Sequence, residues 1–129
     1  MTSYRLPIDQ HQEFPPRASS VRAARRLVAD VLEASSYEGD VEIVLLLVSE
    51  VVTNAVRHAA TPFELSIAAD GEEVTVAVVD HDRAHPPKVR NPKPEDTSGR
   101  GLRIVEELAS SWGTEPLPND AKRVWFRCS

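Results

Sequence analysis

Two short segments of the chain carry groups suited to binding a metal-bound phosphate. Glu50 and Asn54 lie four positions apart in an otherwise apolar stretch, so on a helix they project from the same face, one turn apart. Further along, Ser98-Gly99-Arg100-Gly101-Leu102 places two glycines just before an amphipathic run. The start of a helix there offers backbone N–H groups to an anion. Together the two segments indicate a site for a phosphate held through a divalent cation.

The two polar side chains of the first segment have a functional and a structural interpretation. Asn54 offers a neutral oxygen, and Mg²⁺ commonly takes one or two protein oxygens together with phosphate oxygens and water. Glu50 is placed to accept a proton from an attacking hydroxyl group, or to orient that group. The structural alternatives are an Asn54 satisfied by a neighbour on the helix surface and a Glu50 paired with Asn54 or Arg57.

Asp80 ends the apolar run that begins at Val74. A carboxylate at such a strand end can accept a hydrogen bond from an exocyclic amine such as that of adenine, with apolar walls around the base. The structural alternative is an aspartate that starts a turn. A zinc site is not indicated, because His58, His81, His85 and Cys128 match no zinc-ligand spacing. A serine hydrolase is equally unsupported, since no Gly-x-Ser-x-Gly occurs.

Hydrophobic periodicity predicts three helices and five strands around these residues. The helices are expected over 19–34, with Ser19 or Ser20 as the N-cap, over 40–59, with Asp40 as the N-cap, and over 100–111. The strands are expected around Glu13 and Phe14, over 63–67, 74–80, 112–116 and 122–128. The run over 74–80 is apolar on both faces and should be the central, covered strand. Asp70-Gly71 predicts a hairpin turn before it.

The helix expected over 40–59 has an unusual distribution of polar side chains. An apolar stripe runs along one side, and polar residues gather on the other: Glu50, Asn54, Arg57 and His58. Leu46 and Leu47 lie on that polar side, one or two turns earlier. The pattern predicts a helix that is buried on every face at its start and opens a polar window near its end. Such a window favours a cleft wall over a solvated surface.

These elements predict a single domain spanning residues 1–129, with a flexible lead over 1–11 and a lid loop over 81–98. The expected fold is a two-layer α/β sandwich, in which three helices cover one face of a mixed β-sheet.

Composition narrows the classes of function and setting. The net charge of -5 disfavours direct nucleic-acid binding, and the longest apolar run, Ile43 to Val48, is too short to cross a membrane. The first residues lack an export signal, and the single cysteine, Cys128, fits a reducing cytoplasmic setting. A local basic cluster, Arg17, Arg22, Arg25 and Arg26, is either a solvated helix face or a docking surface for an acidic protein partner.

The motifs resemble those of a known family. Glu50-Val-Val-Thr-Asn54-Ala-Val-Arg-His58 resembles the N-box of the GHKL ATPase superfamily, and Ser98-Gly99-Arg100-Gly101-Leu102 resembles its second glycine box. Over about residues 12–128 the chain is similar to the stand-alone bacterial anti-sigma factor serine-protein kinases, particularly their actinobacterial ATP-binding relatives. The resemblance implies a histidine kinase-like ATPase (Bergerat) fold.

The resemblance also implies roles for individual residues and partners. Asn54 would hold Mg²⁺ on the phosphates of ATP, Asp80 would bind adenine, and Gly99, Arg100, Gly101 and Leu102 would wrap the phosphates with their backbone. Glu50 would be the catalytic residue that activates a serine hydroxyl on a protein substrate. The implied partners are a sigma factor, a phosphorylated anti-anti-sigma antagonist, and a second copy in a homodimer.

One departure from the family pattern keeps a second function open. The first glycine box of the family reads Asp-x-Gly-x-Gly, whereas this chain has Asp80-His81-Asp82-Arg83-Ala84. Without glycine the backbone cannot so readily open space for a nucleotide, and Asp82 adds negative charge. The alternative is therefore a non-catalytic partner-binding module of the same fold, with nucleotide binding weakened or lost.

Overall fold

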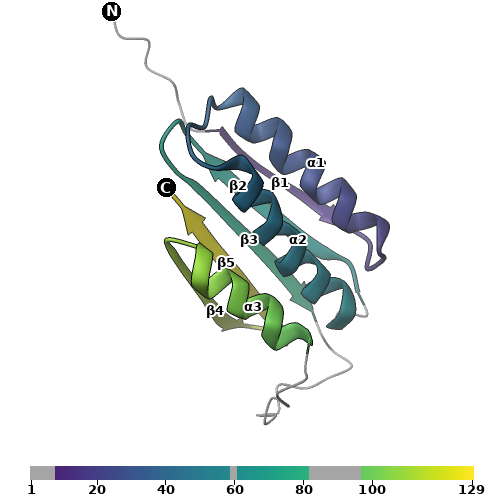
Figure 1. The fold of residues 1–129 in the computed structure, drawn as a ribbon. Coiled ribbons are helices and arrows are strands. Elements are labelled where there is room, and N and C mark those ends of the chain that lie inside the picture. The colour runs from purple at the N-terminus through teal and green to yellow at the C-terminus, as the bar shows by residue number, and fades with distance from the viewer. Residues whose placement is uncertain (1–7, 59–60, 82–96) are drawn as a thin grey trace, which may run out of the picture.

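A computed structural model describes residues 8–58, 61–81 and 97–129 of the chain. Within these ranges the chain forms three helices and five strands (Figure 1). Their order is β1 (Ile8–Phe14), α1 (Ser19–Ala34), α2 (Val41–His58), β2 (Phe63–Ala69), β3 (Val74–His81), α3 (Thr97–Leu108), β4 (Ser111–Leu117) and β5 (Ala121–Cys128).

The five strands form one sheet with the order β1-β2-β3-β5-β4. All three helices lie on one face of this sheet (Figure 1), so the predicted two-layer α/β sandwich is confirmed. The prediction of a mixed sheet is wrong, because every strand pairing among the described residues is antiparallel. Strands β3 and β4, which are connected through α3, run in the same direction. They do not pair with each other, because β5 lies between them and is antiparallel to both. The prediction that the strand over 74–80 is central is confirmed.

The core lies between the sheet and the helices. Side chains of β2, β3 and β5 alternate, and every second one points to the helical layer. The fully buried members on the strands include Phe63, Leu65, Ile67, Val76 and Phe126. Helices α1 and α2 supply the opposing valines and leucines. Each such side chain stabilises the fold by about 1.5–3 kcal/mol relative to leaving it in water.

Helix α2 packs between α1 and α3, and this position changes one expectation. Leu47 is fully buried, but its neighbour Leu46 is 40% exposed. The prediction that the helix is buried on every face at its start is therefore wrong. The side expected to be polar contains both buried and half-buried residues. Leu47 and Asn54 turn toward the buried side, with exposed fractions of 0% and 6%, while Glu50 is half-buried.

Several element boundaries also differ from the prediction. Strand β1 begins at Ile8, so residues 8–11 are not part of a flexible lead. Helix α3 begins at Thr97 and ends at Leu108, three residues earlier than expected at each end. The chain then enters β4 at Ser111. Residues 1–7 and 82–96, which include most of the expected lid, lie outside the described residues.

The helix caps follow the prediction at one helix and not at the other. Asp40 Oδ1 accepts a hydrogen bond from the Ile43 N–H at 3.1 Å, as expected for the N-cap of α2. The N-cap of α1 is Ala18, which makes no side-chain cap bond. The prediction of Ser19 or Ser20 is wrong because the Ser20 hydroxyl donates instead to the Pro15 carbonyl at 2.6 Å.

The hairpin predicted at Asp70-Gly71 is present between β2 and β3. Asp70 Oδ1 accepts the N–H groups of Glu72 and Glu73 at 2.7 and 2.8 Å. These bonds favour the ionised carboxylate and hold the pKa of Asp70 below its usual value.

The orientation of α2 can be tested by replacing each of two adjacent leucines, Leu46 and Leu47, with alanine. We expect Leu47→Ala to lower the free energy of unfolding by about 2–5 kcal/mol, because it leaves a cavity in the core. Leu46→Ala is the matched control and should change that energy by less than about 0.5 kcal/mol. Urea unfolding followed by circular dichroism measures both. Equal losses for the two variants would contradict the orientation of α2.

The single cysteine gives a second test. Cys128 ends β5 and is buried, and its burial raises the pKa of the thiol. Because the thiolate is the reactive form, we expect slow labelling of the native protein by a thiol reagent at pH 8 and rapid labelling after denaturation. Equal rates in both states would contradict the described position of Cys128.

Candidate functional site

The chain segments that carry the predicted site residues meet at one end of the molecule. The register pairs Glu64, at the start of β2, with Val79, near the end of β3. Helix α2 ends at His58, shortly before β2, so its last turns lie over the end of β3, which it contacts. Helix α3 follows β3 in the chain, packs beside α2 and begins at this same end (Figure 1).

Asn54 is the most informative side chain at this end. It is 6% exposed, and its Oδ1 atom has no hydrogen-bond partner among the described residues. Leaving a buried acceptor unsatisfied costs about 1–3 kcal/mol, and buried polar groups in proteins rarely remain so. The structural alternative, in which a protein neighbour satisfies this oxygen, therefore finds no support within the described residues. An amide oxygen in this state is a suitable ligand for a hard cation.

Glu50 lies one turn earlier on α2 and is half-buried. The four-residue spacing places it on the same side as Asn54, as the sequence predicted. The Glu50 side chain remains partly accessible to solvent and therefore to a substrate.

Asp80 lies inside β3 and does not start a turn. Its side chain is 2% exposed and faces the helical layer, in the same alternation as Val76 and Val78. Strand β5 places Lys122 directly opposite, with 4.0 Å between Lys122 Nζ and Asp80 Oδ2. A buried ionised carboxylate is unfavourable without compensating charge or hydrogen bonds. The lysine, 41% exposed, supplies that charge at the edge of the site.

Sequence reasoning gave Lys122 no role in the site. Its partnership with Asp80 depends on the register of β5 against β3, across a connection that includes α3 and β4. The alternation of apolar residues in the last strand was visible in the sequence, but the strand order was not. The order β3-β5-β4 is the observation that brings the two side chains together.

The second glycine segment forms the first turns of α3. Gly99, Arg100 and Gly101 are helical, so they do not precede the helix as the sequence suggested; their side-chain environment lies outside the described residues. The first N–H groups of a helix have no intrahelical partner and remain available to an anion. Leu102, the sixth residue of α3, is half-buried and packs against the core. Like Gly101 it lies beyond the first turn, where the backbone N–H bonds to the carbonyl four residues earlier, so the N–H groups open to an anion are those of the first turn, from Thr97 to Gly99.

The described residues contain no cluster of three or more His, Cys, Asp or Glu side chains that could hold a metal by itself. The single amide oxygen of Asn54 is the kind of ligand that Mg²⁺ takes beside phosphate and water oxygens. In the part of the chain that the structure describes, no helix combines the length and apolar character needed to cross a membrane.

The arrangement of these segments matches a known domain family. The model of the histidine kinase-like ATPase domain matches residues 14–124. The chain belongs to the histidine kinase-like ATPase family. The matched range of this ATPase domain runs from the end of β1 into β5 and contains Glu50, Asn54, Asp80 and the start of α3.

Comparison with solved structures supports the same fold. The crystal structure of the RsbU and RsbW domains of Rv1364c from Mycobacterium tuberculosis superimposes with a TM-score of 0.68 at 18% sequence identity. The alignment covers 94% of this ATPase-family chain and 32% of that one, so the chain spans about a third of its solved neighbour. A search of curated proteins found no match.

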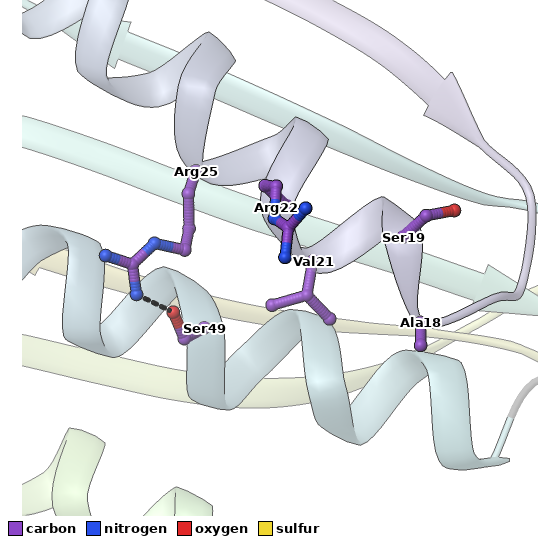
Figure 2. Close-up of a pocket in the computed structure, with 6 residues that line it drawn as sticks. All are labelled: Ala18, Ser19, Val21, Arg22, Arg25 and Ser49. Carbon is purple, nitrogen blue, oxygen red and sulfur yellow. Dashed lines mark hydrogen bonds between the residues drawn. The ribbon is translucent and has the colours of Figure 1, made fainter.

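A separate groove lies on the other side of α2, between α1 and α2 (Figure 2). It has a volume of about 680 Å³ and is lined by Ala18, Ser19, Val21, Arg22, Arg25 and Ser49. Arg25 crosses it and donates to Ser49 Oγ at 2.8 Å. Two members of the basic cluster noted in the sequence therefore line a groove, while Arg17 and Arg26 are exposed nearby.

The unsatisfied oxygen of Asn54 generates a stability prediction. Asn54→Leu has similar volume and removes the buried polar atoms, so without ligand the free energy of unfolding should stay the same or rise by about 0–2 kcal/mol. Thr53→Val, on the adjacent half-buried position, is the control for a polar-to-apolar change in α2. Chemical unfolding measures both. A loss above about 2 kcal/mol for Asn54→Leu would show that Asn54 has a structural partner.

Proposed function

We propose that this protein binds Mg²⁺-ATP and acts as an anti-sigma factor with serine-protein kinase activity toward an anti-anti-sigma antagonist. The observation that carries the proposal is the buried Asn54 oxygen without a hydrogen-bond partner among the described residues, at the end where α2, β3 and α3 meet. The family match supports ATP binding, and the motif resemblance supports the finer assignment.

Each site residue then has a distinct task in binding. Asn54 holds Mg²⁺, which neutralises charge on the phosphates. Asp80 accepts a hydrogen bond from the adenine amine, and Lys122 supplies a positive charge 4.0 Å from that buried carboxylate. The first N–H groups of α3, which begins at Thr97, receive the phosphate oxygens, and Gly99 is the predicted residue that lies among them.

The chemical step is the transfer of a phosphoryl group to a serine of the protein partner. The serine oxygen forms a bond to the γ-phosphorus, the bond from that phosphorus to the bridging oxygen breaks, and ADP leaves. Glu50 orients the serine hydroxyl and accepts its proton. Because the protein forms no covalent bond with the phosphoryl group, the rate depends mainly on how the reactants are positioned and on stabilisation of the charge in the transition state.

Two partner proteins follow from this function. The protein would sequester a sigma factor by binding it, and the antagonist would compete with the sigma factor for this protein. Phosphorylation of the antagonist would end that competition. The α1–α2 groove is the surface that we assign to an acidic partner segment, since Arg22 and Arg25 line it and Arg26 is exposed nearby. This surface lies apart from the nucleotide site, so binding and catalysis can be altered separately.

A second candidate function is a partner-binding module without catalysis. The observation that favours it is the sequence after Asp80, His81-Asp82-Arg83-Ala84, which has no glycine. Residues 82–84 lie outside the described residues. The two candidates differ in one measurable property, the affinity for Mg²⁺-ATP.

Calorimetric titration with Mg²⁺-ATP distinguishes these functions. We expect binding, and a stabilisation of about 2.7 kcal/mol when the nucleotide concentration is about 100 times Kd. Asn54→Leu should abolish the Mg²⁺-dependent part of the affinity, whereas Thr53→Val should bind normally. No heat and no thermal shift at millimolar nucleotide would rule out the kinase and favour the binding module.

Catalysis needs its own assay. Incubation with labelled ATP and candidate antagonists should label a serine of one antagonist. Glu50→Gln should lower the rate by about 10²–10⁴-fold with little change in nucleotide affinity, because it removes only the proton acceptor. An unchanged rate would remove Glu50 from the catalytic role.

A further inference from the structure

Two charged side chains end the helix-facing surface of the sheet at the candidate site. The register of β3 against β5 pairs Val78 with Val124, and then Asp80 with Lys122. Because side chains alternate along a strand, all four point toward the helical layer. Val78 and Val124 are buried, with exposed fractions of 2% and 3%. The surface is therefore apolar up to its last helix-facing pair, in which one side chain is acidic and the other is basic.

The two members of this last pair lie at different depths. The Asp80 side chain is 2% exposed, whereas the Lys122 side chain is 41% exposed. The carboxylate is thus inside the site, and the ammonium group stands at its rim. A ligand atom that is hydrogen-bonded to Asp80 Oδ2 comes close to the Lys122 ammonium group, which is 4.0 Å from that oxygen. Any group that Asp80 binds is therefore within reach of the lysine.

The distance between the two charges leaves the lysine able to bind a ligand. A hydrogen bond between an ammonium group and a carboxylate is about 2.7–2.9 Å long. Lys122 Nζ and Asp80 Oδ2 are 4.0 Å apart, so they attract each other without a hydrogen bond between these two atoms. An ammonium group carries several N–H donors and no acceptor. The donors of Lys122 can therefore turn to an acceptor on a ligand while its charge still compensates that of Asp80.

The Watson–Crick edge of adenine presents the complementary groups. Its 6-amine is a hydrogen-bond donor, and the neighbouring ring atom N1 is an acceptor. A protein that recognises this edge needs an acceptor and a donor side by side. Asp80 supplies the acceptor and Lys122 supplies the donor, from directly opposed positions on adjacent strands. The pair is thus suited to both atoms of this edge, whereas Asp80 alone is suited only to the amine.

We propose that Lys122 determines base specificity by donating a hydrogen bond from Nζ to N1 of adenine, while Asp80 accepts one from the 6-amine. The 6-amine would lie at the deeper position and N1 nearer the rim, in the same order as the two side chains. The bond to N1 has a charged donor, which makes it stronger than a bond between neutral groups. This contact depends on the proposed function, because it requires that ATP binds at this end of the molecule.

The same pair of side chains disfavours guanine. Guanine has a carbonyl oxygen at position 6 and an N–H group at position 1, so its donor and acceptor are exchanged relative to adenine. In the orientation that suits adenine, the guanine oxygen would face the Asp80 carboxylate and the N1–H group would face the Lys122 ammonium group. Mismatched polar groups in a buried site weaken binding, because they lose their bonds to water. We therefore expect ATP to bind more tightly than GTP.

A purely structural role for Lys122 would have a different consequence. In that case the ammonium group only compensates the buried charge of Asp80, and its removal would weaken the binding of every adenine nucleotide by the same factor. A contact with N1 is lost only when the ligand has an N1 atom. The two roles are therefore separated by removing N1 from the ligand and Nζ from the protein, singly and together.

Calorimetric titration with the Mg²⁺ complexes of ATP and 1-deaza-ATP tests the proposal. In 1-deaza-ATP a C–H group replaces N1, and the 6-amine and the phosphates are retained. The wild type should bind ATP about 10- to 100-fold more tightly, as expected for one hydrogen bond to a charged group. Lys122→Met keeps a long unbranched side chain but removes the donors, so it should bind both nucleotides with equal affinity. Arg123→Met, whose side chain points to the other face of the sheet, is the matched control and should keep the wild-type ratio.

The ratio of the two affinities is measured within each variant, so a partial loss of folded protein does not change it. The wild-type ratio requires no substitution at all, and thermal unfolding checks that both variants are folded. Equal wild-type affinities for ATP and 1-deaza-ATP would overturn the contact with N1 while leaving ATP binding intact. The same conclusion would follow from an unchanged ratio in Lys122→Met, or from GTP binding as tightly as ATP. A wild type that binds neither ATP nor 1-deaza-ATP would overturn both this contact and the proposed function.

Discussion

The candidate site is organised around one buried atom, the Asn54 side-chain oxygen, which has no hydrogen-bond partner among the described residues. Asn54 belongs to the buried side of helix α2, where Leu47 and Val51 have exposed fractions of 0% and 1%. The surrounding packing tolerates an acceptor that no described residue satisfies. The fold would be more stable if this acceptor were paired or replaced by an apolar group. Its presence therefore indicates a ligand that supplies the missing partner.

The rest of the architecture places complementary groups around that oxygen. The antiparallel register brings Asp80 to the end of the central strand and Lys122 beside it. The order β3-α3-β4 brings the start of α3 to the same end, with N–H groups that suit an anion. A carboxylate, an amide oxygen and a helix start thus come from three elements that are separated in the sequence. Their different chemistries suit the three parts of a metal-bound nucleotide.

Much of this arrangement could be predicted from the sequence. The periodicity of 19–34 and 40–59 and the alternation of 63–67 and 74–80 are strong local signals, and the elements lie where those signals place them. The N-box spacing of Glu50 and Asn54 also predicted their shared face. The pairing of Asp80 with Lys122 could not be predicted from the sequence, because it depends on the order of the strands in the sheet. Leu46 and Leu47 could not be distinguished, because the burial of α2 is decided by how α1 and α3 pack on either side.

The central claim is that a metal-bound triphosphate lies between Asn54 and the start of α3. Substituting Mn²⁺ for Mg²⁺ in the complex with ATP and recording amide NMR spectra tests this most directly, since the paramagnetic ion broadens signals from nearby nuclei. The account predicts that the Asn54 side-chain amide and the Gly101 backbone amide broaden first. Broadening confined to other parts of the chain, with both of these signals unchanged, would contradict it.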